Sequence, residues 1–440
     1  MDSKLTVGIL GMGYVGCTLA AYIADRGHTV IGIEADPVRL GLLKSGQAPM
    51  RETGLDEMLS RAIKSGDVRF EHDAAVVQTC DVVLIAVGTP LGEDGGADLS
   101  DVTSCAESLV PHLRDGQAVV LKSTLPPGST SDILAPILRR SANVHVAFSP
   151  ERLAEGQALN DIQTIPIIVG GVDDESTEAV AKVFKSIFAV EIVPAQNSTA
   201  AELTKLADNL WIDLNIALAN ELAKVSDSLG VDALDVIRCA NSLPKGQGNV
   251  NILIPSIGVG GYCLTKDPLF LHSFARSKGL DIKTPIASRT VNDSMPDYTV
   301  DRMLKHFSEQ GLKPDQATIG VLGVAFKTNT SDCRFSPTIP TIKRLIAEGF
   351  KVRLYDPWVN TSVIQDLFGI DPQPTLEDTM RDADCIAFFT GHDEFKQIPL
   401  ETIAEMSAPG SLVFDGRMFF PRASIVRMRE LGMIYKGIGR

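Results

Sequence analysis

Residues 6–16 read TVGILGMGYVG, in which a short β-rich run, Thr6–Leu10, leads into the pattern G-x-G-x-x-G at Gly11, Gly13 and Gly16. Glycines in this pattern allow the tight turn after the strand, the approach of the backbone to a pyrophosphate, and close packing of the next helix on the strand. The amides at the start of that helix can bind a diphosphate without basic side chains. The stretch therefore predicts a dinucleotide-binding turn at the start of an α/β domain.

An acidic residue follows the second β-rich run, Thr29–Ile33. This residue, Glu34, lies about 20 residues beyond the glycine turn, where a carboxylate can bind both ribose hydroxyls and repel a 2′-phosphate. That placement favours NAD over NADP. Glu34 can equally be an exposed loop acid, and Asp36 before Pro37 fits a helix N-cap with proline at the first helical position. The turn Val87-Gly88-Thr89-Pro90 is expected to face the same crevice, although alone it is an ordinary turn.

Short β-rich runs alternate with longer amphipathic segments through the first half of the chain. The runs after the first two are Val82–Val87, Ala118–Lys122, Val144–Phe148 and Ile165–Val169. This alternation predicts a parallel sheet with helices on both faces. It returns from about residue 313, with the runs Ile319–Leu322, Val352–Tyr355, Cys385–Phe389 and Leu412–Phe414.

A helical region separates the two alternating regions. Residues 199–229 contain no Gly or Pro, and a helix of this length can connect two domains or form the seam of a homodimer. We expect an α/β protein with two Rossmann-like doubly wound domains, joined by a long central helix and a helical middle domain. The expected boundaries are 1–198, 199–312 and 313–440.

The charge balance bears on the partners of the protein. Lys and Arg number 41 against 55 Asp and Glu, which gives a net charge of −14. A chain this acidic lacks the electrostatic footprint of a protein that binds nucleic acid or an anionic membrane. Any phosphate-bearing ligand must therefore be held locally, by helix N-termini and a few cations.

Cysteine usage and hydropathy bear on the compartment. The seven cysteines form no CxxC or Cys/His cluster, which argues against a disulfide framework and against a structural zinc site, and we expect no metal. The N-terminal residues show no long apolar segment typical of a signal peptide. The longest apolar runs are far shorter than the ~20 residues that span a bilayer. We expect a cytoplasmic protein.

Cys263 differs from the other six cysteines, which sit in ordinary apolar or amphipathic contexts. It lies in GVGGYCLTKDP, residues 258–268, where glycines permit a ligand to approach the backbone. A helix start near Pro268 and the neighbouring Lys266 both favour a nucleophilic thiolate. The same residues also fit a glycine-rich loop with Asp267 as an N-cap, and the pattern alone leaves both interpretations open.

Two further clusters carry charged side chains. Glu202, Lys205 and Asn209 share one face of the long helix, and a cation with an amide one turn away suits the stabilisation of an oxyanion. The residues alone favour a solvated helix face. In Ser149-Pro150-Glu151-Arg152-Leu153-Ala154-Glu155 the two glutamates would lie one turn apart on a helix. Ser149 as N-cap before Pro150 is the structural alternative there.

Together these motifs resemble the UDP-glucose/GDP-mannose dehydrogenase family over nearly the whole chain. The blocks that carry the resemblance are GMGYVG, KSTLPPGST (122–130), SPERLAEG (149–156), AAELTKLADN (200–209), GVGGYCLTKDP, GVAFKTNTSDCR (323–334) and FDGR ending at Arg417. Their order along the chain is more specific than any single block.

The resemblance implies oxidation of the C6 alcohol of a nucleotide sugar to a carboxylate, with two NAD per turnover. In such enzymes a first hydride transfer makes an aldehyde, which the thiolate of Cys263 would attack to form a thiohemiacetal. A second hydride transfer would leave a thioester, which water hydrolyses. Lys205 and Asn209 would stabilise the oxyanion that forms at C6 in each step.

The resemblance also implies roles in proton transfer. Thr124 and Asp267 would position water, and Glu151 is the candidate base for hydrolysis. The first alcohol proton would pass to Lys205 or to a water bound by Asp267. Glu155 would organise the nicotinamide side.

The second α/β domain would hold the nucleotide, with Lys327 at the sugar diphosphate. Arg334 and Arg417 are cations suited to phosphate or sugar, or else ordinary surface charges. Tyr355-Asp356-Pro357 is interpreted as structural. The expected cofactor-binding residues are Gly11, Gly13, Tyr14, Val15, Gly16, Glu34, Asp36, Arg39, Thr89, Thr124, Glu155 and Lys266. The expected substrate-binding residues are Glu151, Arg152, Leu153, Lys205, Asn209, Asn249, Gly260, Lys327, Arg334 and Arg417.

This sequence departs from the family pattern at the substrate positions. Glucose members typically show GFGGSC and N-acetylhexosamine members GVGGHC, whereas here Tyr262 takes the variable place. Asn249 replaces an arginine that reaches sugar or phosphate, often across the dimer, and Lys245 is a candidate substitute. Ile168-Val169-Gly170-Gly171 is similar to the N-acetyl branch, and Lys266-Asp267 to the glucose branch. We expect a UDP-linked hexose, with N-acetylhexosamine slightly ahead of glucose.

Two other functions stay open at this point. A two-electron dehydrogenase of the 3-hydroxyacid or 6-phosphogluconate type shares the N-terminal turn and the helical middle but needs no Cys263. A non-catalytic nucleotide-sugar sensor would keep the fold, although the joint presence of Cys263, Lys205, Asn209 and Asp267 argues against it. One or two NADH per product distinguishes the two enzymes.

Overall fold

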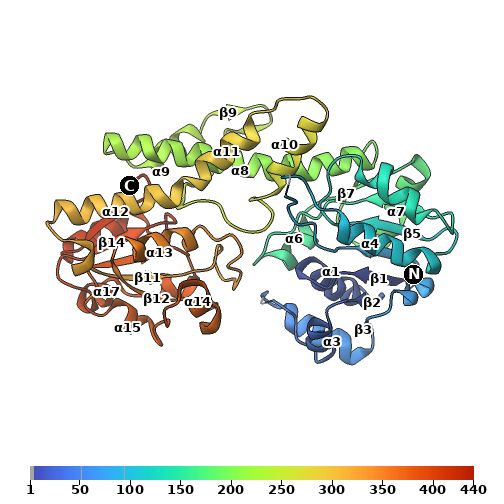
Figure 1. The fold of residues 1–440 in the computed structure, drawn as a ribbon, viewed down its shortest axis with the longest axis horizontal. Coiled ribbons are helices and arrows are strands. Elements are labelled where there is room, and N and C mark those ends of the chain that lie inside the picture. Colours follow the sequence, from blue (N-terminus) through green and yellow to red (C-terminus); the bar gives the residue numbers. More distant parts are fainter. Residues whose placement is uncertain (1–3, 51, 94) are drawn as a thin grey trace. The chain divides into compact units, whose positions relative to one another are not determined.

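The computed structural model describes residues 4–50, 52–93 and 95–440 (Figure 1). The chain forms two compact units. The first comprises Met1–Asp208 and Leu269–Asp281, and the second Asn209–Pro268 and Ile282–Arg440. The expected class, an α/β protein with two Rossmann-like regions, is confirmed. The division at residues 198 and 312 stays a prediction.

The first unit is built on an eight-stranded sheet in the order β3-β2-β1-β4-β5-β6-β7-β8. The strands are β1 Thr6–Leu10, β2 Thr29–Ile33, β3 Val68–Glu71, β4 Val82–Ile85, β5 Ala118–Leu121, β6 His145–Phe148, β7 Ile167–Gly171 and β8 Ile192–Pro194. Every pairing is parallel except β6 with β7, which is antiparallel. The expectation of a wholly parallel sheet is therefore wrong at that pairing, and β3 and β8 were not expected.

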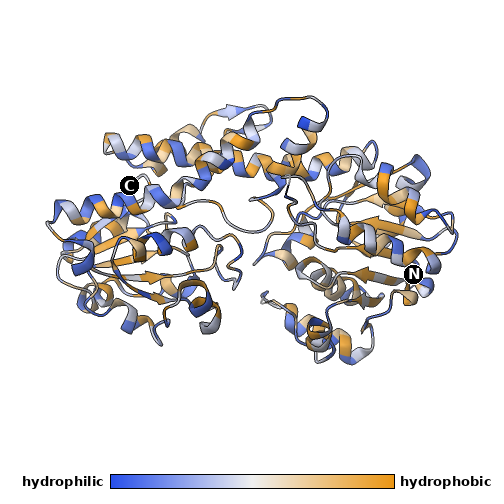
Figure 2. Cartoon of the chain, in the orientation of Figure 1, coloured by the Kyte–Doolittle hydropathy of each residue, from blue (hydrophilic) through white to orange (hydrophobic). Residues whose placement is uncertain are grey.

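Helices cover both faces of this sheet, as the alternation predicted. They are α1 Tyr14–Asp25, α2 Pro37–Lys44, α3 Leu55–Ser65, α4 Ser100–Leu109, α5 Ala135–Leu138, α6 Ala158–Thr164 and α7 Asp174–Ile187. Short 3-10 helices occur at η1 Ala74–Thr79 and η2 Val110–His112, and a short π-helix at η3 Thr130–Leu134. In β4 alternate residues enter different cores: Val82 and Leu84 pack with α1, and Val83 and Ile85 pack with α4. Both faces of the strand are therefore buried, as the continuous apolar run requires. The strands of the large sheets are coloured mainly as hydrophobic in Figure 2.

The second unit contains most of the long helix α8, Ser198–Leu229, and a five-stranded parallel sheet in the order β12-β11-β13-β14-β15. Its strands are β11 Thr318–Leu322, β12 Lys351–Tyr355, β13 Cys385–Phe388, β14 Leu412–Asp415 and β15 Ile434–Gly437, of which β15 was not expected. Its remaining elements are α9 Ala233–Ala240, β9 Pro244–Lys245, β10 Gly248–Asn249, α11 Thr284–Asp293, α12 Met295–Glu309, η4 Pro314–Gln316, α13 Thr338–Ala347, α14 Thr361–Phe368, α15 Leu376–Met380, α16 Asp393–Lys396, α17 Leu400–Met406 and α18 Arg422–Glu430. Helix α10, Asp267–Ser277, starts in the second unit, and its residues from Leu269 onward belong to the first.

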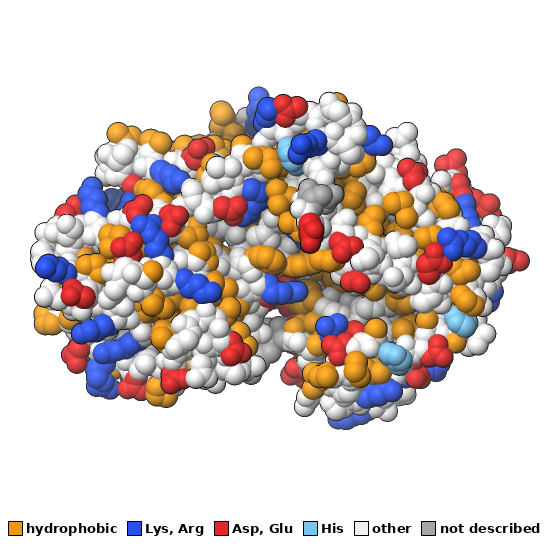
Figure 3. Space-filling view, in the orientation of Figure 1, with side chains coloured by type: hydrophobic (Ala, Val, Ile, Leu, Met, Phe, Trp, Pro, Cys, Tyr) orange, Lys and Arg blue, Asp and Glu red, His pale blue; other side chains and the backbone are white. Residues whose placement is uncertain are grey.

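The surface carries mixed charge and one apolar stripe. Acidic and basic side chains are interspersed over the face shown in Figure 3. Along α8, Trp211, Leu214, Leu218 and Val225 are all more than a third exposed and share one side of the helix. Within the described ranges, no helix combines the length and the hydropathy needed to cross a bilayer.

Candidate active site

The three glycines of the first turn have three different surroundings. Gly11 has φ +88° and lies so close to the end of β4 that a Cβ would be 2.8 Å from the Ala86 carbonyl oxygen. A Cβ on Gly16 would be 2.1 Å from the Gly11 carbonyl oxygen, which fixes α1 tightly against the turn. Around Gly13, the residue that precedes α1, a Cβ would meet nothing within 4 Å. The turn thus has two structural glycines and one open position at a helix N-terminus, as a dinucleotide diphosphate requires.

Glu34 lies at the end of β2, directly beside this turn. It is 5% exposed, so the interpretation as an exposed loop acid is wrong. One carboxylate oxygen accepts the Met12 amide at 3.0 Å and the other accepts the Asp36 amide at 2.9 Å, while Arg39 contacts the first at 3.2 Å. Because each oxygen has two lone pairs, the carboxylate retains acceptor capacity for ribose hydroxyls.

The residues around Glu34 and the turn have structural partners. Asp36 caps α2, accepting the Val38 amide at 2.8 Å, with Pro37 at the first helical position, as the N-cap interpretation predicted. The Tyr14 hydroxyl donates to Glu52 at 2.7 Å, and burial together with this carboxylate raises the pKa of Tyr14. Glu52 was not expected from the sequence, and its surroundings in RETGL carry no local signal.

Glu52 also fixes the SPERLAEG segment. Its carboxylate accepts the amides of Gly156 at 2.7 Å and Ala158 at 3.1 Å, and Asp161 accepts the Ala154 amide at 2.9 Å. Residues 150–154 consequently form an irregular stretch and residues 155–157 a turn, and α6 starts at Ala158. The expected helix with Ser149 as N-cap is therefore wrong.

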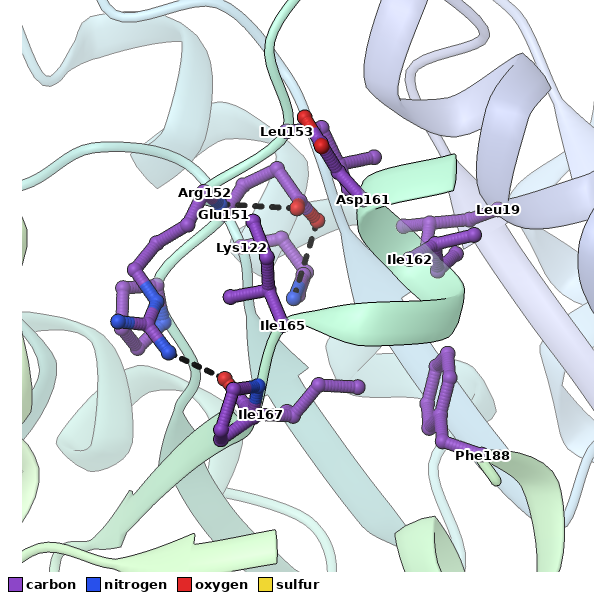
Figure 4. Close-up of a pocket in the computed structure, with 12 residues that line it drawn as sticks. Leu19, Lys122, Glu151, Arg152, Leu153, Asp161, Ile162, Ile165, Ile167 and Phe188 are labelled. Carbon is purple, nitrogen blue, oxygen red and sulfur yellow. Dashed lines mark hydrogen bonds and ion pairs between the residues drawn. The ribbon is translucent and has the colours of Figure 1, made fainter. Parts of the chain in front are cut away.

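Two polar links join the carboxyl ends of β4, β5 and β6. Thr89, 3% exposed, donates its hydroxyl to the Thr124 carbonyl at 2.8 Å. The buried Lys122 ammonium lies 3.1 Å from the Glu151 carboxylate (Figure 4). It also lies 3.4 Å from the Ser149 hydroxyl. Lys122 was not among the expected site residues, although its place in KSTLPPGST at a strand end is a usable signal.

Arg152 and Leu153 follow Glu151 along the wall of a small pocket (Figure 4). The Arg152 guanidinium donates to the Pro166 carbonyl and lies 3.8 Å from Asp208. Leu153 packs against the core that includes α1. Glu155, in the turn before α6, acts on Tyr14 electrostatically, and its negative charge also raises the pKa of the phenol.

The charged face of α8 is buried. Glu202, Lys205 and Asn209 are 0%, 7% and 6% exposed, so the expectation of a solvated face is wrong. The Glu202 carboxylate accepts the amides of Gly128 at 2.6 Å and Thr130 at 2.7 Å and the Thr130 hydroxyl at 2.6 Å. Burial raises the pKa of Glu202 to about 7, against the effect of these hydrogen bonds.

In the second unit a buried cluster follows the cysteine. Asp267, 0% exposed, accepts the Asn209 amide at 2.5 Å and the Lys266 ammonium at 2.8 Å. Cys263 itself is exposed, and its carbonyl accepts the amides of Lys266 at 3.2 Å and Asp267 at 2.9 Å, so that one turn separates it from the start of α10 at Asp267. The expected helix start near Pro268 is confirmed.

The other cysteines are mostly inert. Burial raises the pKa of Cys17, Cys105 and Cys333 to about 12 and that of Cys80 to about 11. Thiols with a pKa in this range are almost entirely protonated near neutral pH. Cys239, on α9, shares with Cys263 an exposed position and serves as a natural comparison.

The loop before Cys263 packs against the loop after β11. A Cβ on Gly260 would be 2.7 Å from Pro337, and the Gly261 amide donates to the Arg334 carbonyl at 3.2 Å. The Lys266 ammonium and the Arg334 guanidinium lie over the Tyr262 ring, 5.0 Å and 5.4 Å from its centroid. The variable position of the motif is therefore occupied by a ring that contacts two of the expected ligand-binding cations.

The remaining expected substrate residues take different positions. Lys327 follows β11 and is half-buried, and Arg334 is exposed and held by Asp332 at 2.9 Å. Arg417 is no surface charge: it donates to the carbonyls of Phe326 and Phe389, and burial lowers its pKa to about 10. Asn249 lies exposed in the β9–β10 hairpin, whose other strand carries Lys245.

Among the described residues, no group of three His, Cys, Asp or Glu side chains is placed to hold a metal ion.

Three models of the UDP-glucose/GDP-mannose dehydrogenase family match the chain in order. The NAD binding domain matches residues 5–188, the central domain residues 199–294 and the UDP binding domain residues 320–422.

Individual relatives match over almost their whole length. The UDP-N-acetyl-D-mannosamine dehydrogenase of Methanococcus maripaludis is 34% identical over 413 residues, 92% of this chain and 91% of that protein. The UDP-N-acetyl-D-glucosamine 6-dehydrogenase of Salmonella typhi is 28% identical, covering 95% and 97%. The solved structure of a UDP-D-ManNAc dehydrogenase from Pyrococcus horikoshii matches with a TM-score of 0.87 at 30% identity, covering 99% of each chain. A UDP-glucose dehydrogenase structure from Pyrobaculum islandicum matches equally, with a TM-score of 0.87 at 30% identity, covering 100% and 98%.

Proposed function

The chain belongs to the UDP-glucose/GDP-mannose dehydrogenase family, and from this premise we propose that it oxidises the C6 hydroxymethyl group of a UDP-sugar to a carboxylate. It is an NAD-dependent oxidoreductase with a UDP-binding domain. The proposed balance is one CH2OH group, one water and two NAD+ giving one carboxylate, two NADH and three protons. NAD, when bound, accepts the hydride in each oxidation.

The observation that carries the proposal is the arrangement around Cys263. An exposed sulfur stands at the start of α10, and the next residues bring the buried Lys266 and Asp267 together with Asn209. A helix N-terminus and a nearby ammonium both favour the thiolate form of a cysteine. We propose that this thiolate adds to the C6 aldehyde as a thiohemiacetal, and that loss of a second hydride leaves a thioester.

Charged side chains would serve the oxyanion and the water. Lys205 and Asn209 are both buried on α8, so a donor held there has lost its competing solvent and stabilises a developing C6 oxyanion more strongly. Thr124 and Asp267 would hold the water that hydrolyses the thioester, with Glu151 as base. The first alcohol proton has two candidate acceptors, Lys205 and a water on Asp267.

The residues at the first turn fit NAD. The open position at Gly13 admits a diphosphate, and the Glu34 carboxylate has room for ribose hydroxyls and repels a 2′-phosphate. Three further side chains support this edge of the site. Asp36 caps α2, Arg39 contacts Glu34, and Thr89 donates to the Thr124 carbonyl just after β5. We propose that Glu155 and Lys266 act on the nicotinamide side.

We propose a UDP-N-acetylhexosamine as substrate, slightly ahead of UDP-glucose. The relatives from Methanococcus and Salmonella carry names of N-acetyl sugars, and the motif at Ile168–Gly171 is similar to that branch. Lys266-Asp267 favours the glucose alternative. Lys327, Arg334 and Arg417 are the proposed cations of the nucleotide half, with Arg417 acting by holding two loop carbonyls.

The test is a panel of nucleotide sugars scored by NADH yield per acid formed. Cys263→Ala is expected to abolish acid formation while UDP-sugar binding, measured by calorimetry, survives. Cys239→Ala, which removes the other exposed sulfur, is the matched control and should keep full turnover. One NADH per product would support a two-electron dehydrogenase, and binding without turnover on any sugar would support a sensor.

The apolar stripe on α8 supports a homodimer. Trp211, Leu214, Leu218 and Val225 present a row of large apolar side chains to solvent, which a second copy of the chain would cover. We propose that two copies associate through this face. The cytoplasmic location expected from the sequence stays a prediction.

A further inference from the structure

Three loops meet at the carboxyl edge of the second sheet. The chain passes from β11 to its neighbour β12 on one side and then to β13 on the other. The order of the strands therefore reverses between β11 and β13, and in open α/β sheets a ligand binds in the crevice at such a point. The loops that follow these two strands begin at residues 323 and 389.

A buried histidine connects the three loops. His392, 0% exposed, lies in the loop after β13, and its Nε2 is 3.2 Å from an oxygen of Asp356, which follows β12. Its Nδ1 accepts a hydrogen bond from the backbone amide of Asn329 at 2.9 Å, and Asn329 belongs to the loop after β11. Since an amide N–H can only donate, Nδ1 must carry the lone pair and Nε2 the proton.

The bond to Asn329 supports the loop that carries Lys327. Asn329 has φ +56°, a conformation that non-glycine residues adopt only when their surroundings hold them. Its side chain is paired with Asp393 in both directions, at 2.6 Å and 3.1 Å. Thr330 closes the turn by donating to the Lys327 carbonyl at 3.0 Å. The imidazole therefore links the loop after β11 to the loop after β12. Its partner Asn329 lies two residues from Lys327, the proposed phosphate ligand.

We propose that His392 is a positioning residue for the nucleotide site, which holds the Lys327 loop only while its imidazole is neutral. A proton on Nδ1 removes the acceptor and turns a hydrogen bond with the Asn329 amide into a contact between two donors. The loop then loses its support, and the affinity for a UDP-sugar falls in acid. This inference rests on the proposed binding of the diphosphate near Lys327.

Charged side chains from the loop after β12 and from α16 lie around the ring. The Asp356 carboxylate lies next to Nε2 and also accepts backbone amides, including that of Val324 at 2.7 Å. Asp393 precedes Lys396 on α16, and the two are paired at 2.6 Å. The hydrogen-bond pattern around the ring is one that only the neutral imidazole satisfies.

Two substitutions test the two hydrogen bonds of the imidazole separately. Asn places its oxygen where Nδ1 lies, so His392→Asn keeps the acceptor for the Asn329 amide at every pH. Gln places its amide where Nε2 lies, so His392→Gln keeps the donor to Asp356 and loses the acceptor. Neither side chain titrates.

The first measurement is calorimetric binding of UDP-N-acetylglucosamine, without NAD, at about pH 8 and about pH 5.5. The diphosphate of this ligand is esterified at both ends, so neither phosphate titrates in that range. We expect the affinity of the wild type to fall about fivefold or more in acid, as for loss of one buried hydrogen bond. His392→Asn should bind equally at both pH values, and His392→Gln weakly at both. A wild-type loss that persists in His392→Asn, or tight binding by His392→Gln, would overturn the proposal.

A second measurement leaves His392 intact, in case either variant fails to fold. The Trp358 ring is stacked on His392 with centroids 6.3 Å apart, and a protonated imidazole quenches indole fluorescence. In a Trp211→Phe background, Trp358 is the only tryptophan. A saturating UDP-sugar should move the fluorescence midpoint to lower pH by about the logarithm of the affinity ratio, because the two equilibria are linked. An unmoved midpoint contradicts the inference, whereas absence of binding at every pH contradicts the proposed function instead.

Discussion

Alanine at Gly16 and at Gly13 should damage the protein in different ways, although the two residues belong to one motif. At Gly16 the new Cβ would lie 2.1 Å from a backbone oxygen of Gly11, which no side-chain rotation relieves. Overpacking of this kind costs about 1–3 kcal/mol, and a rigid backbone neighbour favours the upper end. At about 3 °C per kcal/mol for a unit of this size, Gly16→Ala should lower the melting temperature of the first unit by up to about 9 °C.

Gly13→Ala should weaken NAD binding and leave the stability of the protein almost unchanged. Its Cβ meets no atom within 4 Å and its φ of −79° is ordinary for alanine, so stability should change by less than about 0.5 kcal/mol. The methyl group would instead occupy the space through which a diphosphate approaches the start of α1, and NAD affinity should fall at least about tenfold. Thermal unfolding without ligand and NAD titration separate the two effects. Equal melting temperatures for the two variants, or wild-type NAD affinity in Gly13→Ala, would refute the assignment of the glycines.

Three further outcomes are expected. Because the folded-state pKa of Glu202 is raised to about 7, its contribution to the free energy of unfolding is present below about pH 4.5 and lost as the pH rises through 7. Denaturant titrations of the wild type and of Glu202→Gln should therefore differ in free energy of unfolding by an amount that changes by about 3 kcal/mol over this pH range. Parallel plots of unfolding free energy against pH for the two proteins would contradict this prediction. Lys122→Met leaves the Glu151 carboxylate without its buried cation and should cost about 3 kcal/mol, with slow thioester hydrolysis, whereas Lys122→Arg should recover part of both; an undiminished midpoint in chemical denaturation would argue against the ion pair. Leu218→Glu should yield a monomer in sedimentation, and Val426→Glu, an equally exposed position on α18, should leave the oligomeric state unchanged; identical behaviour of the two would reject the α8 interface.

The central strands were predictable because both their faces are buried. β1 and β2 were predicted residue for residue, since the β-rich runs TVGIL and TVIGI stand next to turn signals. In the two larger sheets, the strands that were not expected are β3, β8 and β15, which all lie at sheet edges and have three or four residues. Edge strands are short and partly solvated, so their apolar pattern is weak. The antiparallel direction of β7 is a matter of chain path, which local composition does not encode.

The predictions for the site that were wrong concern residues whose hydrogen-bond partners are distant in the sequence. The helix expected in the segment Ser149–Glu155 is absent, and the backbone amide of Gly156 that follows it is bound by Glu52, about a hundred positions earlier. The face of α8 with Glu202 was expected in water because its partners, Gly128 and Thr130, lie far upstream in sequence. By contrast, the glycine turn and the start of α10 after Cys263 follow from local backbone requirements, and both were predicted.

The open glycine at the start of α1 has a consequence for solution conditions. Where lysines and arginines hold a phosphate, added salt competes directly and weakens binding. Here the groups that face the expected diphosphate are backbone amides and a helix dipole, in a chain whose net charge is −14. NAD affinity should therefore fall less with added salt than it would at a site built of lysines and arginines, so that dinucleotide saturation changes little between dilute buffer and a concentrated, potassium-rich medium.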